Sequence, residues 1–428
     1  MSIHKHLVAC AALAVAGGPA LAQTQMRPAE AGMSAARLQR VTEVSDKYVA
    51  DGSLSGVVTL VYRKGQPAYV SARGFQDLAT RIPMRRDTIF AMASMTKPIT
   101  AVAAMMLVED GRLGLDEPVD RLLPELANRM VLNSPTGPLN DVRPASRPIT
   151  LRDLLTYRMG IGVTGYAGIP EDTPIAKAFA GLSAPGVTAD QYMARLGALP
   201  LVYNPGERFM YNTPSTVLGV LVARASGMPF EQFLETRIFR PLGMKDTAFF
   251  VPAEKRSRVA TVYNFGPGGK LVPANRVAPS TVPVFPNAAG GLYSTADDYM
   301  MFARMMLGKG RLGGGRLGGG RLGWARILSR PSVELMTRDY LTSEAPQSFF
   351  VYKNFFADAG FGLGLQVQNR QTSLGPAPGS YWWQGATGVS WTADPKEELI
   401  FVRLIQRMGP PPLFYGDSTT AIYQAIDD

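Results

Sequence analysis

The spacing of apolar residues near the start of the chain predicts a helix, a β-hairpin and a second, buried helix. Between residues 33 and 50, apolar residues recur every three or four positions, and a glycine follows as a stop. Residues 56–62 and 67–74 are strand-like runs around a short turn that contains glycine, which predicts a hairpin. Residues 94–110 predict a helix whose second half is apolar nearly all round, as in a buried helix.

The middle of the chain has a different pattern. From about residue 112 to 290 it is rich in Pro and Gly and shows no long alternating strands. Helical spacing recurs in several short stretches: 151–157, 188–196, 215–225 and 230–239. We therefore expect a mostly helical lobe over residues 112–289. A sequence typical of a helix start, residues 294–298, precedes a further expected helix over 299–307.

The clearest strands lie near the C-terminus, over 361–366, 381–385, 388–393 and 398–404, followed by a closing helix over 419–426. Strands at both ends of the chain, with helices between them, imply one sheet built from distant segments. The predicted fold class is therefore α+β. An antiparallel sheet region (residues 23–111 and 290–428) is flanked by helices, and the helical lobe is inserted into it.

A short repeat interrupts the C-terminal part. The sequence Gly-Arg-Leu-Gly-Gly occurs nearly three times within residues 310–323. Three short copies are too few for a solenoid, so we expect a flexible, positively charged surface loop. A phosphate-binding loop is the alternative, but no Gly-Lys-Ser/Thr sequence follows to open a helix.

The N-terminus predicts export. Lys5 precedes an apolar run over residues 7–18, and Ala20-Leu21-Ala22 provides small residues for cleavage, so residues 1–22 are interpreted as a signal peptide. Cys10 ends a sequence similar to a lipoprotein box, but too little apolar chain precedes it for lipidation to be favoured. No later run is long enough to span a bilayer. We expect an exported protein, periplasmic or secreted, with no integral membrane segment.

Charge and composition exclude few classes of binding partner. The formal net charge of +10 becomes 10 − 1 = +9 when Lys5 is removed, and the apolar fraction of 46% is ordinary for a globular protein. Lys and Arg do not cluster with interleaved aromatic residues, so no nucleic-acid partner is expected.

The distribution of His and Cys restricts the chemistry. His4, His6 and Cys10 all lie within residues 1–22, so the mature chain would have neither residue type. A Ser-His-Asp triad, a thiolate nucleophile and a zinc site are therefore not expected, and we expect no metal and no cofactor. If the protein is a hydrolase, a lysine or a tyrosine must act as its base.

Ser94 and Lys97 are the strongest candidates for that chemistry. Residues three apart on a helix share one face, so the amine can reach the hydroxyl. A serine at a helix N-terminus also meets free backbone N–H groups, which suit a developing anion. Burial would lower the pKa of the lysine and allow a neutral amine. Ser-x-x-Lys also arises by chance, as in Ser2-Ile-His-Lys5, so the tetrapeptide alone is weak evidence.

The context of this tetrapeptide resembles a known family. Phe90-Ala-Met-Ala-Ser94-Met-Thr-Lys97-Pro-Ile-Thr100 is similar to the nucleophile segment of the serine β-lactamase-related hydrolases. That group includes class C β-lactamases, DD-peptidases and family VIII carboxylesterases. Further similar motifs follow in order over nearly the whole mature chain: 107–111, 118–119, 149–156, 205–206, 209–213, 237–244, 290–295, 383–385 and 394–395.

The resemblance implies a role for each site residue. Ser94 would be the nucleophile, and Tyr211, in the family's tyrosine motif, would be a general base that works with Lys97. Whether Lys97 or Tyr211 takes the first proton stays open. The backbone N–H groups of Ser94 and Ala386 would form the oxyanion hole.

Two departures from the family pattern bear on the substrate, and the second favours esters. The Tyr-x-Asn motif is here Tyr211-Asn212-Thr213, which puts the usual amide contact to the acyl chain in doubt. The Lys-Thr-Gly motif is replaced by Trp383-Gln384-Gly385, so the lysine that holds a substrate carboxylate is missing. Trp383 would line the substrate site or simply cover the sheet. Gln384, Gly385, Asn212 and Thr213 are the other candidate substrate-binding residues.

The resulting hypothesis is an exported serine esterase that cleaves small, short-acyl carboxylic esters through an acyl-enzyme on Ser94. A β-lactamase or D-Ala-D-Ala-type peptidase on the same scaffold is the first alternative. A catalytically silent binding homologue is the second, although Ser94, Lys97 and Tyr211 are all intact.

Overall fold

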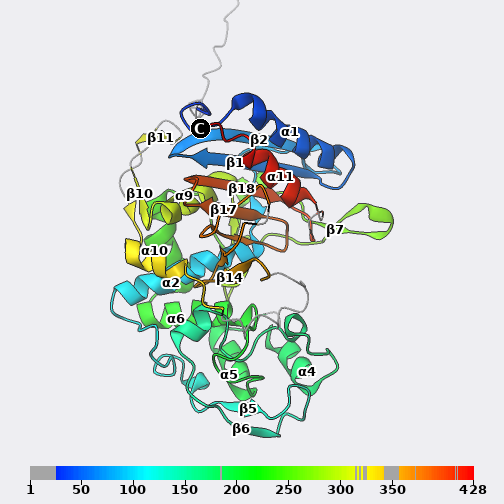
Figure 1. Cartoon of the computed structure of the whole chain (residues 1–428). Coiled ribbons are helices and arrows are strands. Elements are labelled where there is room, and N and C mark those ends of the chain that lie inside the picture. Colours follow the sequence, from blue (N-terminus) through cyan, green and yellow to red (C-terminus); the bar gives the residue numbers. More distant parts are fainter. Residues whose placement is uncertain are drawn as a thin grey trace, which may run out of the picture.

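An eight-stranded antiparallel sheet forms the centre of the fold (Figure 1). The computed structural model describes residues 26–428 except 184–185, 314–315, 318–319, 322–324, 342–355, 372, 410 and 412. The signal peptide expected over residues 1–22 therefore lies outside the described residues. In spatial order the strands are β14 (Ala359–Phe361), β15 (Gln366–Gln368), β16 (Tyr381–Gln384), β17 (Ser390–Asp394), β18 (Leu399–Ile405), β1 (Gly56–Arg63), β2 (Gln66–Asp77) and β3 (Ile82–Pro83).

The two ends of the chain meet in the middle of this sheet. Strand β1 pairs with β18 from Val57 opposite Ile405 to Arg63 opposite Leu399. Every residue of both strands is buried, as expected for central strands that are covered on both faces. One sheet from both chain ends, flanked by helices, confirms the predicted α+β class.

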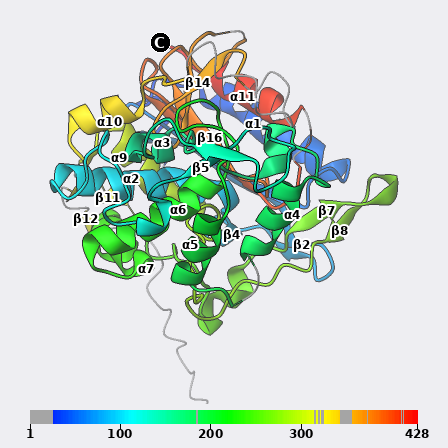
Figure 2. The ribbon, with the colours of Figure 1, turned by 90° about the horizontal axis from the view of Figure 1, so that it is seen from below.

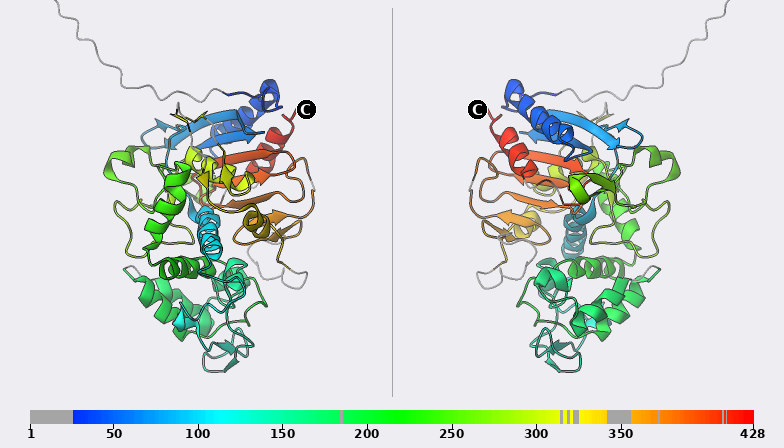
Figure 3. Two further views of the ribbon diagram at one scale, coloured as in Figure 1. Left: turned by 90° about the vertical axis from the view of Figure 1, so that its left-hand side faces the viewer. Right: turned by 90° about the vertical axis from the view of Figure 1, so that its right-hand side faces the viewer.

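Helices cover both faces of the sheet. Helices α1 (Ala35–Ala50) and α11 (Phe414–Tyr423) pack together on one face, where Val61 contributes to a small core (Figure 3). Helix α9 (Ala296–Leu307) packs on β1, β17 and β18, and Val58 and Leu60 belong to the large core. The side chains of β1 thus point to the two faces of the sheet in turn, because a strand has a period of two residues.

The stretch of residues 112–289 is rich in helices, several of which lie below the sheet in Figure 1 and towards the viewer in Figure 2. Its α-helices are α3 (Leu151–Leu155), α4 (Pro174–Ala180), α5 (Ala189–Ala198), α6 (Thr213–Ser226), α7 (Phe230–Leu234) and α8 (Arg240–Leu242). It also holds two short strand pairs, β5 (Met130–Leu132) with β6 (Val142–Pro144) and β7 (Tyr263–Phe265) with β8 (Leu271–Pro273). The boundaries 112 and 289 stay a prediction.

One expected strand is wrong, and the expected closing helix is present with different ends. Residues 361–366 do not form one strand, because the chain turns between β14 and β15, where Gly362 N–H donates to Leu365 O at 2.8 Å and Gly364 has φ +84°. The closing helix begins at Phe414 and ends at Tyr423, since buried Phe414 packs on Tyr48. The helix expected over residues 419–426 therefore starts earlier and ends earlier than predicted.

The repeat over 310–323 is not simply a loop. Its described residues form two short antiparallel ladders, β10 (Arg311–Leu312) with β13 (Ala325–Arg326) and β11 (Arg316–Leu317) with β12 (Gly320–Arg321). Leu312 is buried and belongs to the large core, which ties the first ladder to the body. In the described ranges, no helix is both long enough and apolar enough to cross a membrane.

Candidate active site

Ser94 lies where a strained turn enters a helix. It is part of a 3₁₀ turn, η1 (Ala93–Met95), directly before α2 (Thr96–Glu109). Ala93 has φ +44°, which is unfavourable for a residue with a Cβ. The Thr96 hydroxyl holds this conformation, because it donates to Ala93 O at 2.8 Å and accepts from Leu292 N–H at 3.2 Å. Ser94 itself is half-buried.

Lys97 reaches Ser94 from one turn further along. Its Nζ lies 3.0 Å from Ser94 Oγ, 2.9 Å from Asn212 Oδ1 and 2.5 Å from Ala289 O. The side chain is 1% exposed, and these hydrogen-bond partners are uncharged. Burial therefore lowers the pKa of the Lys97 amine well below its ordinary value of 10.5. A neutral amine at this position can accept the Ser94 proton.

Tyr211 is buried beside Lys97 in a cluster of aromatic rings. Lys97 Nζ lies 4.5 Å from the centre of the Tyr211 ring. The rings of Tyr166, Tyr157 and Trp383 lie 5.3, 5.7 and 6.0 Å from it. The Tyr157 hydroxyl lies 2.6 Å from Ser215 Oγ, and burial raises the pKa of Tyr157 well above 10.0. Tyr157 therefore stays protonated and is a support for Tyr211 rather than a base.

The backbone after Tyr211 forms a tight three-residue turn. Asn212 has φ +78° and ψ −60°, and Thr213 N–H donates to Tyr211 O at 3.1 Å, which is a strained γ-turn. This turn directs the Asn212 amide oxygen to Lys97. Thr213 is buried instead beside Tyr192, whose pKa burial raises to about 12 while hydrogen bonds from Thr213 and Thr216 lower it. The structure thus brings Asn212, and not Thr213, to Lys97.

The turn after β16 lies against the segment before Ser94. A Cβ added to Gly385 would lie 2.5 Å from Met92 O, so only glycine permits this approach. The Thr387 hydroxyl donates to Ala91 O at 2.7 Å and fixes the same contact. Ala386, between them, is exposed. The geometry places the Ala386 turn beside the nucleophile turn, as an oxyanion hole formed by Ser94 and Ala386 N–H groups requires.

Trp383 and Gln384 occupy opposite faces of β16. Trp383 is 2% exposed and packs on Phe361 at 5.3 Å as well as on Tyr211, whereas Gln384 is half-buried. The position that would carry a lysine in a Lys-Thr-Gly motif therefore presents an uncharged ring to the site. In the part of the chain that the structure describes, no cluster of three His, Cys, Asp or Glu side chains could hold a metal ion.

Replacement of Asn212 by aspartate should change the pH dependence of Ser94 reactivity. A carboxylate next to Lys97 Nζ favours the ammonium, so the pKa of Lys97 should rise and the neutral amine should form at higher pH. We expect the rising limb of the labelling rate by a fluorophosphonate probe to move up by about 1–3 pH units. Asn128→Asp is the matched control, because Asn128 also has a positive φ and is exposed. An unmoved limb in Asn212→Asp would contradict the role of this contact.

Several functional contacts were not predicted from the sequence. Ala289 contributes only a carbonyl oxygen, and backbone groups leave no signature in the residue type. The roles of Thr96 and Tyr157 depend on segments that are distant in the chain. Asn212 was expected to touch substrate. The one signal for its contact with Lys97 is that the asparagine directly follows Tyr211, one position earlier than in the Tyr-x-Asn motif.

Comparison with known proteins places this site in a wider group. The family model described as Beta-lactamase matches residues 41–425. Protein Rv1367c of Mycobacterium tuberculosis is 40% identical over 371 residues, which are 85% of this chain and 89% of that protein. Esterase EstB of Burkholderia gladioli is 34% identical over 281 residues, 61% of this chain and 68% of that protein.

A solved structure agrees with the sequence comparisons. The structure described as "EstCE1, a hydrolase with promiscuous acyltransferase activity" superposes with a TM-score of 0.75 and 25% identity, and covers 92% of this chain and 99% of that chain. Lovastatin esterase of Penicillium rubens is 28% identical over 382 residues, 84% of this chain and 90% of that protein. The similarity thus extends over most of the chain and includes all the candidate site residues that lie within residues 41–425.

Proposed function

Because the chain belongs to the Beta-lactamase family and is a hydrolase of that fold, we propose that it is an exported serine carboxylesterase for small, short-acyl esters. The observation that carries the proposal is the contact of Lys97 Nζ with Ser94 Oγ at 3.0 Å. Lys97 is buried there, and its hydrogen-bond partners are uncharged. Export rests on the sequence of residues 1–22.

Acylation begins at Ser94. Lys97, as a neutral amine, accepts the Ser94 proton while Oγ attacks the ester carbonyl carbon. The negative charge on the carbonyl oxygen is stabilised by the N–H groups of Ser94 and Ala386. When the tetrahedral intermediate collapses, the C–O bond to the alcohol breaks, and the Lys97 and Tyr211 pair returns the proton to the leaving oxygen. The products are the acyl-enzyme and the free alcohol.

Deacylation repeats these steps with water. The pair of Lys97 and Tyr211 removes a proton from water, and the hydroxide attacks the acyl carbon. The bond between that carbon and Ser94 Oγ breaks, and Ser94 regains the proton. The carboxylic acid leaves, and the site returns to its initial state. The supporting geometry is the position of Tyr211, whose ring centre lies 4.5 Å from Lys97 Nζ.

The uncharged Trp383 supports a preference for ester substrates over β-lactams and D-Ala-D-Ala peptides. Both alternative substrate classes bear a carboxylate, and Trp383 stands where an ammonium would pair with it. A charged hydrogen bond of this kind contributes about 1.5–3 kcal/mol. EstB and lovastatin esterase, which are similar to this chain, are described as esterases.

A matched pair of substrates tests this preference. We expect kcat/KM for p-nitrophenyl butyrate to exceed that for nitrocefin by at least about 10-fold, since the lactam carboxylate finds no ammonium partner. We also expect the methyl ester of the same lactam to react no more slowly than its free acid. Both are measured under one set of conditions by absorbance. Faster turnover of the free acid would favour a β-lactamase.

Transfer of the acyl group to an alcohol is a second candidate activity. The observation in its favour is the similarity to EstCE1, which is described as a hydrolase with promiscuous acyltransferase activity. An alcohol can attack the same acyl-enzyme carbon in place of water. The yield of methyl butyrate relative to butyric acid, in the presence of methanol, separates the two outcomes.

A further inference from the structure

The exposed apolar side chains of this protein concentrate on one segment. Among the described residues, five of the ten large hydrophobic side chains that are exposed fall within residues 263–284, which we call the apolar strip. They are Phe265, Val272, Val277, Val282 and Val284, and their exposure ranges from 42% to 76%. Single exposed apolar residues are common on protein surfaces, but this segment holds half of those among the described residues.

The apolar strip begins with a hairpin that projects from the body of the protein. Strands β7 and β8 extend sideways from the sheet region (Figures 1 and 2). The base of the hairpin is fixed, since Tyr263 N–H donates to Gln406 O at 2.9 Å and the Tyr263 hydroxyl accepts from Leu78 N–H at 2.7 Å. Leu78, in the turn after β2, and Ile82, in β3, are exposed apolar residues too.

The charges on the apolar strip have one sign. Residues 259–296 contain no Asp or Glu, whereas Lys270 and Arg276 lie within the strip and are exposed. Neither of these two cations forms an ion pair with another described residue. Apolar side chains flanked by free cations match the chemistry of a lipid surface that carries anionic headgroups.

The apolar strip is connected to the active site. Its chain continues to Ala289, whose carbonyl accepts from Lys97. Strand β7 is bonded to residues 406–408, and Arg407 N–H donates to Thr387 O at 2.9 Å in the oxyanion turn. The strip is therefore joined through backbone contacts to two parts of the Ser94 site, the Ala289 carbonyl and the turn at Thr387.

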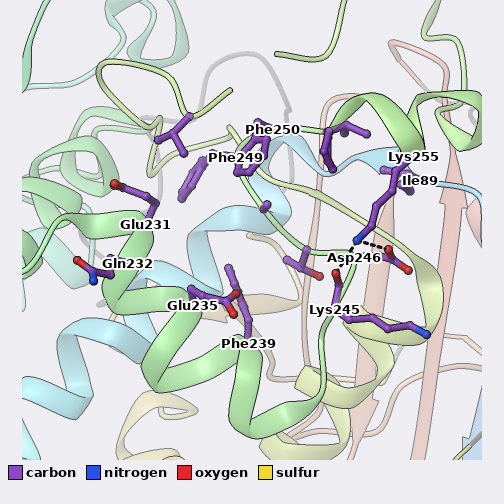
Figure 4. A pocket seen from close by; sticks show the side chains of 15 residues that line it. Ile89, Glu231, Gln232, Glu235, Phe239, Lys245, Asp246, Phe249, Phe250 and Lys255 are labelled. Carbon is purple, nitrogen blue, oxygen red and sulfur yellow. Dashed lines mark hydrogen bonds and ion pairs between the residues drawn. The ribbon is translucent and has the colours of Figure 1, made fainter. Parts of the chain in front are cut away.

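A cavity with both apolar and charged lining borders the strip. It has a volume of about 350 Å³, and Val282 of the strip lines it together with Phe239, Phe249 and Phe250 (Figure 4). None of the proposed catalytic residues lines this cavity. Its Lys255 and Asp246 side chains pair with each other at 2.8 Å, so this cation is not free. Glu231 and Glu235 also line the cavity, so only the part of its wall formed by Val282 and the phenylalanines continues the apolar surface of the strip.

We propose that the apolar strip docks on a lipid surface with anionic headgroups and brings the Ser94 site to esters dissolved in it. The apolar side chains would enter the interface, while Lys270 and Arg276 would contact the headgroups. A protein partner would also bury apolar residues, but the absence of acidic residues from 259–296 matches anionic lipid better.

Vesicle sedimentation tests the proposal with the full mature chain. We expect binding to vesicles of phosphatidylcholine mixed with phosphatidylglycerol, and little binding to phosphatidylcholine alone. Phe265→Ser with Val272→Ser, and separately Lys270→Glu with Arg276→Glu, should each reduce the partition coefficient by at least about 10-fold. Leu374→Ser with Leu413→Ser is the control, because these residues are 50% and 69% exposed outside the strip.

Failure of this proposal can be distinguished from failure of the proposed function. Binding does not require turnover, so Ser94→Ala should sediment with the vesicles as the wild type does. All strip variants should keep their activity on water-soluble p-nitrophenyl acetate, which shows that they fold. Absence of binding to both vesicle types would overturn the proposal. So would a dimer in light scattering that Phe265→Ser with Val272→Ser dissociates, because the strip would then bind a second copy.

Discussion

Ser94→Ala should lower kcat for p-nitrophenyl butyrate by at least about 10⁴-fold, which is the order of loss when a covalent nucleophile is removed. The reason is geometric. Ser94 Oγ lies 3.0 Å from the Lys97 amine and follows a turn held in a strained conformation at Ala93. No acyl-enzyme can form without this oxygen. Initial rates of nitrophenol release measure the effect.

Ser134→Ala is the matched control for this variant. Ser134 lies between β5 and β6, where its hydroxyl is 3.4 Å from Thr136 Oγ1, so its loss should leave kcat unchanged. Thermal unfolding should show that both variants are folded. Substantial turnover by folded Ser94→Ala would mean that the chemistry occurs elsewhere.

Lys97→Met should lower kcat/KM for the same ester by about 10²–10⁴-fold, as expected when a general base is lost. Methionine keeps the length and the apolar part of the side chain but cannot accept the Ser94 proton. Lys177→Met, at an exposed position of α4, is the control and should retain full activity. If both variants had equal activity, Tyr211 alone would have to serve as the base.

The lowered pKa of Lys97 gives this prediction a pH dependence. In the wild type kcat/KM should rise with pH as the amine loses its proton, with a midpoint well below 10.5, and Lys97→Met should lack this rise. The stability of the fold should depend on the protonation of the same Lys97 amine. Between the lowered native pKa and the ordinary unfolded value, the unfolded chain binds more protons, so the free energy of unfolding should increase with pH. Lys97→Met should lose that slope in urea denaturation.

Much of the fold could be predicted because local patterns decide it. The hairpin of β1 and β2, the helix α1 and the helix after Thr295 have clear periodicity and caps, and all are present. The strand expected over 361–366 was wrong because a run of apolar residues with glycines fits a buried turn as well as a strand. Its true form depends on β15 and β16, which lie further along the chain.

The site could be predicted only in part, for a similar reason. Helical spacing alone places Lys97 beside Ser94, and the motif order indicates Tyr211. Positions that depend on the backbone were not foreseeable: the carbonyl of Ala289 has no sequence signature, and the γ-turn at Asn212 is a strained conformation that neighbouring segments impose. Thr213 was expected near the substrate but is buried beside Tyr192.

The central claim is that Ser94 is the covalent nucleophile of this hydrolase, and mass spectrometry after labelling with a fluorophosphonate probe tests it most directly. The wild type should gain one adduct per chain, located on Ser94 in the digested peptides, and should lose esterase activity in step with labelling. Ser94→Ala should gain none. An unlabelled but active wild type, or an adduct on another serine that abolishes activity, would contradict the claim.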